Sequence, residues 1–159
     1  MGSSSVQGHP AVIDALNTVL TGELTSINQY FVHAELCEHW GFDKLHGKIR
    51  KESIDEMKHA ESLVERVLFL GGMPNVQRLG KVTIGETVPE ILELDRVLEN
   101  EAIPRLRDAI ALCHTHGDHG TRTLLESILR SEEEHIDWID AQLELIARVG
   151  LENYLASRI

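Results

Sequence analysis

The sequence predicts an all-α protein built as a four-helix bundle, with one long crossover and a short C-terminal fifth helix. Apolar residues recur three and four positions apart along four long stretches, which is the pattern of helices with one buried face. Aromatic residues make up only 4% of the 159 residues, which disfavours a sandwich or a barrel. Two short links and one long link join the stretches, which predicts two antiparallel hairpins connected along the bundle.

The first hairpin is predicted from proline and glycine signals. A helix begins at Pro10, which suits a first helical position, and runs to about Trp40, where a glycine follows. The second helix runs from about Phe42 to Leu70 and ends before GGMPN, which combines a glycine cap with a proline stop. Residues 71–86 have no clear period and are therefore expected to form the crossover.

The second hairpin begins with a helix N-terminal signal. Thr87 is the expected N-cap and Glu90 closes a capping box, so the third helix should run from there to about Thr115. The residues HGDHG at 116–120 break the pattern, and a fourth helix continues to Val149. A glycine then ends this helix, and the last segment, LENYLASRI, is expected to form the short terminal helix.

The composition argues against several classes of function. The net charge is −11 and Lys and Arg form no cluster, which argues against nucleic acid as a partner. No apolar run approaches the ~18 residues that a membrane span needs. Residues 1–10 lack the features of a secretory signal and are expected to be a flexible N-terminal segment. Cys37 and Cys113 fit neither a disulfide framework nor a CxxC site, so a reducing cytoplasm is the expected location.

Each long helix carries ionisable residues in the middle of its inward-facing stripe. They are Glu23 in the first helix, Glu56 and His59 in the second, Glu99 in the third, and Glu132 and His135 in the fourth. Burying an unpaired carboxylate is costly, and the stripes contain no Lys or Arg that would neutralise four of them. Two divalent cations would balance the four carboxylate charges, so the pattern predicts a pair of metal ions in the core.

The same residues repeat with a constant separation. Each residue of the first hairpin recurs 76 positions later in the second, which pairs Glu23 with Glu99, Glu56 with Glu132, and His59 with His135. Each hairpin thus supplies one Glu and one Glu-x-x-His pair, the ligand set of carboxylate-bridged di-iron and di-manganese bundles. Nitrogen and oxygen donors suit iron or manganese, and the absence of thiolates argues against an iron–sulfur cluster. A bundle with a metal-free polar network is the structural alternative.

The sequence resembles the bacterioferritins from about residue 11 to residue 156. The stretches that carry the resemblance are GELTSINQYFVHAE, ESIDEMKHAE, RVLFLGGMPNVQRLGK, EEEHIDW and GLENYL. The resemblance implies a ferritin-like fold, with residues 11–159 forming one ferritin-like di-iron domain. The implied reaction is ferroxidation: Fe(II) is oxidised by O₂ or H₂O₂, and ferric mineral is deposited inside a hollow shell of 24 subunits.

The resemblance also assigns roles to individual residues. Glu56 and Glu132 would bridge two iron ions in each subunit, with Glu23 and His59 completing the shell of one ion and Glu99 and His135 that of the other. Tyr30 lies on the same inward stripe and resembles the tyrosine that the family carries beside the site. A redox role for Tyr30 is open at this point, and a hydrogen-bonded core tyrosine is the commoner interpretation.

Met57 is a further residue that carries the resemblance to the bacterioferritins. It follows Glu56 by one position, so it is rotated by ~100° away from the metal-facing stripe. On its own, one such methionine indicates apolar packing at an interface. The resemblance implies instead that the methionines of two subunits ligate one shared b-type haem. Dimers bridged in this way would build the shell, and a small ferredoxin is implied as the electron donor for iron release.

Other functions are compatible with a di-iron bundle. A DNA-protecting mini-ferritin is disfavoured by the absent basic tail and by a ligand set within one bundle, because mini-ferritins place their metals between subunits. Another di-iron bundle oxidase is a further alternative, although the chain lacks the cysteines of rubrerythrins. The remaining histidines are expected to be unimportant for the site: His33, His39 and His46 as surface residues, and HTHGDH at 114–119 as a solvated turn.

Overall fold

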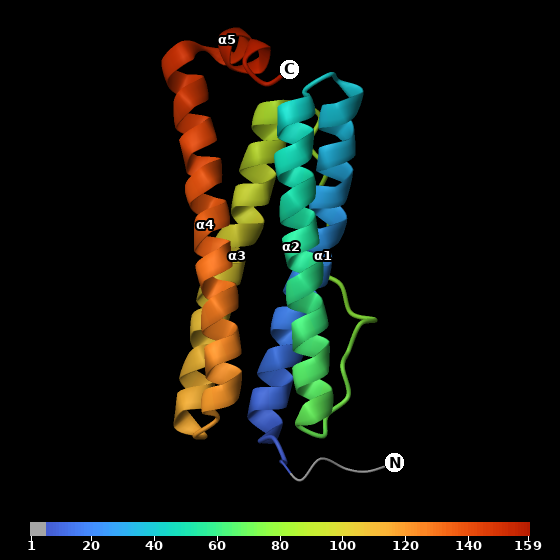
Figure 1. The fold of residues 1–159 in the computed structure, drawn as a ribbon, viewed down its shortest axis with the longest axis vertical. Helices are drawn as coiled ribbons and strands as arrows, with labels where there is room; N and C mark the ends of the chain where they lie inside the picture. Colours follow the sequence, from blue (N-terminus) through green and yellow to red (C-terminus); the bar gives the residue numbers. More distant parts are fainter. Residues whose placement is uncertain (1–5) are drawn as a thin grey trace.

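A computed structural model describes residues 6–159 and confirms the all-α fold (Figure 1). Its four long helices are α1 (Pro10–His39), α2 (Asp43–Phe69), α3 (Val88–Thr115) and α4 (His119–Val149). The short helix α5 (Leu151–Ala156) crosses the end of the bundle at which α1 turns into α2. The part of the chain that the structure describes contains no β-strand. The predicted helix boundaries differ from the observed ones by one or two residues.

The N-terminal segment is described only in part. Residues 1–5, half of the segment expected to be flexible, lie outside the described residues. Gly8 donates its backbone N–H to the carbonyl of Leu70 over 2.9 Å. The imidazole of His9 caps α1 by accepting the backbone N–H of Ala11 over 3.0 Å. Residues 8 and 9 are therefore tied to the bundle.

The crossover, residues 70–87, passes along α1 on its way from α2 to α3 (Figure 1). Side chains on one stripe of α1, spaced by multiples of four residues, accept backbone N–H groups of this segment. The pairs are Asn17 with Asn75 (2.9 Å), Thr25 with Gly80 (2.8 Å), Gln29 with Thr83 (3.0 Å) and His33 with Gly85 (3.0 Å). A segment without regular structure thus satisfies part of its backbone through one face of a helix.

The core is divided into two apolar clusters by a polar layer. The cluster near the α3–α4 turn is built around Leu16, Leu63 and Leu125. The other lies towards α5 and includes Ile49 and Ile139. Both clusters draw on all four long helices, so each fixes the spacing of the helices on one side of the layer between them. The polar layer is therefore held on both sides by well-packed side chains.

The N-terminus of α3 differs in one detail from the predicted capping box. Thr87 accepts the backbone N–H of Glu90 through its hydroxyl, over 3.3 Å, as an N-cap should. The carboxylate of Glu90 accepts the N–H of Glu86 over 2.8 Å, whereas a capping box would pair it with Thr87. The box is therefore displaced by one residue, and the helix still begins where predicted.

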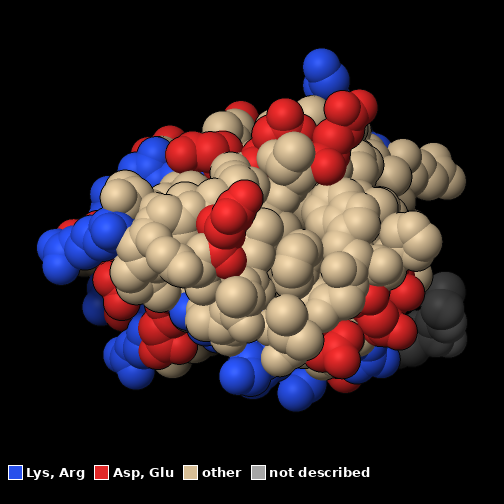
Figure 2. Space-filling model, turned by 90° about the horizontal axis from the view of Figure 1, so that it is seen from above, with Lys and Arg blue, Asp and Glu red and all other residues tan. Residues whose placement is uncertain are grey.

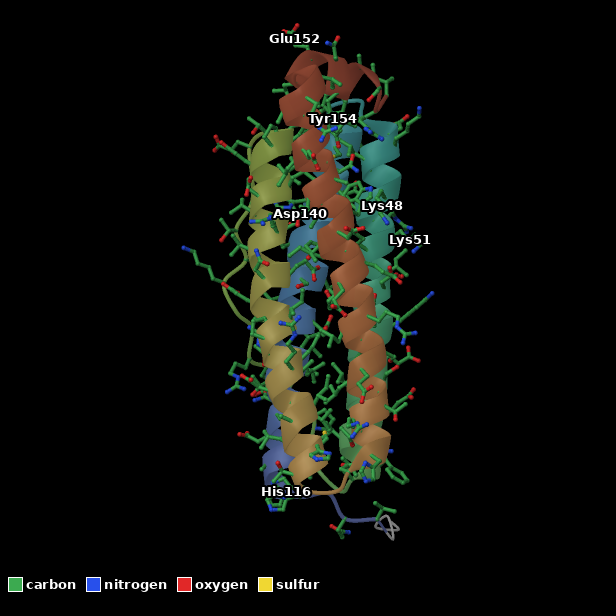
Figure 3. The ribbon with its side chains drawn as sticks, turned by 90° about the vertical axis from the view of Figure 1, so that its left-hand side faces the viewer. Lys48, Lys51, His116, Asp140, Glu152 and Tyr154 are labelled. Atoms are coloured by element: carbon green, nitrogen blue, oxygen red, sulfur yellow. The ribbon has the colours of Figure 1, made fainter. Side chains whose placement is uncertain are left out.

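The C-terminal helix is docked by one buried tyrosine. Gly150 has φ +85°, a conformation that glycine adopts without strain, and it turns the chain sharply from α4 into α5. The side chain of Tyr154 is buried at the end of the bundle, and its O–H donates to Gln142 over 2.7 Å (Figure 3). Among the described helices, none combines the length and the apolar character needed to cross a membrane.

Candidate metal centre

The six predicted ligands meet in the polar layer between the two apolar clusters. They come from four helices: Glu23 from α1, Glu56 and His59 from α2, Glu99 from α3, and Glu132 and His135 from α4. The four carboxylates and His135 are buried, and the side chain of His59 is 15% exposed. Each helix therefore directs a carboxylate inward at the height where the core would otherwise contain leucine or isoleucine.

One half of the site is arranged around His59. Its Nδ1 atom lies 3.5 Å from Glu23 Oε2, 3.6 Å from Glu56 Oε2 and 3.2 Å from Glu132 Oε1. The ligand atoms of these four residues all lie within 4.8 Å of one another. Three carboxylates and one imidazole that converge in this way form a nitrogen–oxygen pocket of the size of one metal ion.

The other half is arranged around His135 in the same manner. Its Nδ1 atom lies 3.1 Å from Glu56 Oε1, 3.4 Å from Glu99 Oε1 and 3.5 Å from Glu132 Oε2. These four residues form a second group whose ligand atoms lie within 4.8 Å of one another. Glu56 and Glu132 belong to both groups and offer one oxygen to each, which is the geometry of bridging carboxylates.

The polar atoms of the site fit a pair of cations. Eight buried side-chain nitrogen or oxygen atoms have no hydrogen-bond partner among the described residues, and six of these belong to the predicted ligands, one atom from each. Buried polar atoms are almost always hydrogen-bonded, so such a concentration in one layer needs an explanation. Metal ions in the two groups would supply a partner for all six atoms. The donor set therefore fits two ions with nitrogen and oxygen coordination.

The protons of the site are distributed unevenly. Burial, followed by the charge of Glu132, raises the pKa of Glu56 to about 7. Burial also raises the pKa of Glu99, and the neighbouring carboxylate of Glu132 raises it further. For Glu132, burial is outweighed by its close contacts with Glu99, His135 and His59, which hold its pKa well below the usual range. Without metal, Glu132 is therefore the ionised carboxylate, while Glu56 and Glu99 tend to keep protons.

The two imidazoles carry protons for the same reason. Burial lowers the pKa of His59, but the nearby carboxylates of Glu132 and Glu56 outweigh burial and raise the pKa to about 9. The pKa of His135 is also raised, because Glu132 and Glu56 outweigh its burial. Metal ions bind deprotonated ligands, so loading of this site requires protons to leave it.

An aspartate that the sequence analysis did not single out orients His135. The Nε2 atom of His135 lies 3.2 Å from Asp55 Oδ2, while Nδ1 faces the site. A proton on Nε2 that is donated to Asp55 leaves the lone pair of Nδ1 free for a metal ion. Lys51 lies 3.5 Å from the same Asp55 oxygen at the surface of α2 (Figure 3). Neither periodicity nor a motif marks Asp55, because it lies beside the stripe.

A second buried polar network, which includes Tyr30, Asp95 and His33, lies next to the site. Tyr30 donates its hydroxyl to Glu99, and burial followed by the charge of Glu99 raises the Tyr30 pKa. One helical turn from Glu99, Asp95 Oδ1 lies 2.7 Å from His33 Nδ1 and accepts from Gln29 over 3.0 Å. The prediction of a surface position for His33 is wrong, because His33 is 0% exposed and accepts a crossover N–H.

The other histidines lie at the two ends of the bundle. His46 is partly buried rather than a surface residue, since its two ring nitrogens contact the carbonyl of Ala34 and the carboxylate of Glu38. His39 is exposed. In the α3–α4 turn, His116 stacks on His9 with ring centroids 3.6 Å apart (Figure 3). No group of three convergent metal ligands occurs in this turn among the described residues.

Glu52 and Met57 mark the inner and outer faces of α2. Glu52 is buried one turn before Glu56, and burial raises its pKa to about 7. Lys48 reaches it from the surface over 3.7 Å (Figure 3). Met57 is 50% exposed, so its thioether lies on the outside of the bundle.

Comparison with known proteins identifies the family of this bundle. Residues 13–149 match the family model described as the ferritin-like domain. A bacterioferritin of Mycolicibacterium paratuberculosis is 48% identical over 151 residues, which cover 95% of each chain. A bacterioferritin of Streptomyces coelicolor and a bacterial ferritin of Pseudomonas aeruginosa are each 48% identical over 97% of this chain, covering 92% and 100% of their own lengths. The chain therefore belongs to the ferritin-like family and, within it, to the bacterioferritins, a membership that supports a function in iron storage.

Proposed function

We propose that the chain is a subunit of an iron-storage ferroxidase, with a di-iron site inside each bundle. Glu56 and Glu132 would bridge the two irons, Glu23 and His59 would complete one shell, and Glu99 and His135 would complete the other. The observation that carries the proposal is the set of six buried donor atoms, one from each of these residues, that lack a hydrogen-bond partner among the described residues. Their division into two groups that share Glu56 and Glu132 supports two ions rather than one.

The reaction oxidises two Fe(II) ions at a time. Two Fe(II) lose two electrons, which reduce one O₂ with two protons to H₂O₂, or one H₂O₂ with two protons to two waters. Two Fe(II) ions held by the six residues would supply both electrons to one oxidant molecule in one place. The Fe(III) formed then passes into a ferric mineral inside the shell.

The residues of the chain prepare the site for this reaction. Asp55 orients His135 so that Nδ1 faces the ions. Glu56, with a pKa near 7, gives up its proton as a cation enters. Tyr30 holds Glu99 in place through its hydroxyl. The buried position between two apolar clusters limits access of bulk water to the reacting oxygen species.

Aerobic addition of Fe(II) to the purified protein tests this proposal. The parent should produce ferric absorbance rapidly, whereas Glu56→Ala and His135→Ala should lose most of the initial rate, because each removes one ligand. Glu61→Ala is the matched control, since Glu61 lies on the exposed face of the same helix. The ferroxidase assignment fails if the two ligand variants oxidise iron as quickly as the parent and the control.

A shell of 24 identical subunits is the proposed assembly. The end of the bundle that carries α5 has a broad uncharged surface with most acidic and basic side chains at its margin (Figure 2). Val149, Leu151 and Ile159 are exposed there, which suits contact with another subunit. Twenty-four chains of 17.8 kDa would give a particle of about 430 kDa. Light scattering that finds only monomers or dimers at working concentration would exclude the shell.

Met57 is the proposed axial ligand of a b-type haem shared by two subunits. Its thioether lies on the outer face of α2 and is half exposed, so a group outside the bundle can reach it. A Met57→Leu variant should lose the haem absorption band while keeping its fold. Met73→Leu is the control, because Met73 lies in the crossover and is 78% exposed. Retention of full haem content by Met57→Leu would dismiss the assignment.

A ferredoxin donor for iron release and a cytoplasmic location remain predictions from the family resemblance and the cysteine content. A DNA-protecting mini-ferritin receives less support, because all six ligands come from one chain and the curated relatives are bacterioferritins. The bacterioferritin function is therefore the one that the site and the relatives favour together.

A further inference from the structure

A cavity separate from the metal centre lies where the crossover passes between α1 and α3. Its volume is about 570 Å³, and its walls are formed by α1 residues 18–29, crossover residues 78–83 and α3 residues 94–105. None of the six metal ligands lines it. A volume of this size is typical of sites for small molecules. The chemistry of its walls indicates which molecules it would accept.

Three cationic side chains line the cavity. Arg78 and Lys81 come from the crossover, and Arg105 comes from α3. Arg78 reaches Thr21 Oγ1 over 3.5 Å, whereas Lys81 and Arg105 make no ion pair or hydrogen bond with any residue in 6–159. Glu101 is the one acidic residue in the lining, and it forms no ion pair with Arg105 within the described part of the chain. The cavity is therefore locally positive in a protein whose net charge is −11.

Arg105 is held against α1 at a glycine. A Cβ atom at Gly22 would lie 2.2 Å from Arg105 Nη1, so the guanidinium occupies space that only glycine leaves open. The residue is partly buried, and its guanidinium forms no ion pair or hydrogen bond within the described chain. A guanidinium that loses water without gaining an acceptor is unfavourable. An anion in the cavity would supply the missing acceptor, in the two-pronged geometry that guanidinium groups form with oxyanions.

Neutral donors complete the lining. Ser26 is 7% exposed and faces the cavity, and its hydroxyl makes no hydrogen bond with the residues that the structure describes. Thr18, at the rim, already donates its hydroxyl to the carbonyl of Asp14 over 3.1 Å. Thr25 accepts the N–H of Gly80 and so fixes the crossover wall. Hydroxyl groups beside guanidinium and ammonium groups are suited to the several oxygens of a phosphate.

We propose that this cavity binds a small phosphate-bearing anion, with Arg105 as its principal contact and Arg78, Lys81 and Ser26 as further donors. Three cations against one exposed carboxylate favour a ligand of two or more negative charges over a simple carboxylate. The volume exceeds the needs of one phosphate group, so a diphosphate should bind more tightly than inorganic phosphate. This site is independent of the proposed iron oxidation, since it shares no residue with the six ligands.

Calorimetric titration of the full-length protein in its native assembly, without iron and in phosphate-free buffer, tests the site. The probes are pyrophosphate and inorganic phosphate. Pyrophosphate should bind saturably with one site per chain, and Arg105→Gln should weaken binding by about ten-fold or more. Arg107→Gln is the matched control, because Arg107 is an exposed arginine of the same helix that does not line the cavity. Its affinity should stay within about two-fold of the parent, as expected for a screened surface charge.

A glycine variant separates geometry from charge. Gly22→Ala should weaken pyrophosphate binding, though less than Arg105→Gln does, because the new Cβ shifts the guanidinium while every charge remains. The melting temperature should not fall, since alanine favours a helix over glycine. The proposal is overturned if no saturable binding occurs, if Arg107→Gln loses as much affinity as Arg105→Gln, or if Gly22→Ala binds like the parent. Because no iron is present, none of these outcomes depends on the ferroxidase reaction.

Discussion

Replacing Glu56 by glutamine should stabilise the metal-free protein at alkaline pH, although it removes a proposed bridging ligand. Glu56 is buried, and the nearest carboxylate, Glu132, is ionised. A glutamine of the same shape avoids the cost of ionising a second carboxylate beside the first. Its amide can still donate to Glu132 in place of the carboxylic proton. Glu56 would therefore lower the stability of the metal-free protein while providing a metal ligand, and the glutamine variant should regain that stability and lose the ligand.

The size of the effect follows from the pKa of Glu56. Burial and the charge of Glu132 raise this pKa from 4.5 to about 7. At ~1.4 kcal/mol per pH unit, the raised pKa lowers the free energy of unfolding by about 3 kcal/mol above pH 7. The loss is absent below pH 4.5, where Glu56 is protonated in the folded and unfolded states alike, and it develops between these two values. The advantage of the variant should therefore grow from about pH 4.5 to pH 7.

Thermal unfolding of chelator-treated protein, followed by circular dichroism at pH 5 and pH 8, measures this difference. For a domain of this length, about 3 kcal/mol corresponds to roughly 6–12 °C in the melting temperature. Glu61→Gln, on the exposed face of α2, should change the melting temperature by little at either pH. A Glu56→Gln variant that melts below the parent at pH 8, or whose gain is equal at pH 5, would refute the reasoning.

Three further predictions concern the site and the chain termini. Loading with Fe(II) or another divalent ion at pH 7 should release protons, because His59 and His135 must lose theirs before they can bind a metal ion. The apparent metal affinity should therefore fall as the pH is lowered. Calorimetric titrations in buffers of different ionisation enthalpy measure the number of protons released. Asp55→Asn should weaken metal binding by about 10- to 100-fold through misorientation of His135, with little change in melting temperature, and unaltered affinity would contradict that role. Gly150→Ala should destabilise the protein by about 1–2 kcal/mol in a chemical denaturation assay, because the φ of +85° at this position suits only glycine. Gly47→Ala in α2 is the control: there is free space for a Cβ at Gly47, so this variant should be neutral or stabilising in the same assay.

The inward stripes and helix ends could be predicted because they depend on local sequence. Proline, glycine and threonine mark where α1 and α3 begin and where α2 and α4 end. The six site residues could be selected because an ionisable residue is easily recognised when the rest of the inward-facing stripe of its helix is apolar. Their division into two equivalent halves could be anticipated from the constant separation of the two sets, whereas the bridging roles of Glu56 and Glu132 came from the family resemblance. The geometry of the structure agrees with this arrangement, while the identity of the metal stays a prediction.

His33 and Asp55 could not be placed from sequence, for different physical reasons. His33 lies on a stripe of α1 that is covered by the crossover, and the crossover has no period from which its course could be predicted. A polar residue on that stripe therefore looks like a surface residue. Asp55 acts through His135, which is 80 positions away, and the contact depends on how α2 and α4 are rotated against each other. Both cases need the tertiary arrangement, which no local pattern contains.

The hydrogen bonds between α1 and the crossover have a consequence for how this surface can change during evolution. Asn17, Thr25, Gln29 and His33 recognise backbone N–H groups, which every residue except proline provides. The side chains of Met73, Val76 and Leu79 point outward and are exposed. Their identity is thus largely free of the requirements of folding. One stripe of α1 fixes the path of the segment, and the exterior of the segment can diverge between relatives without disturbing the candidate metal centre.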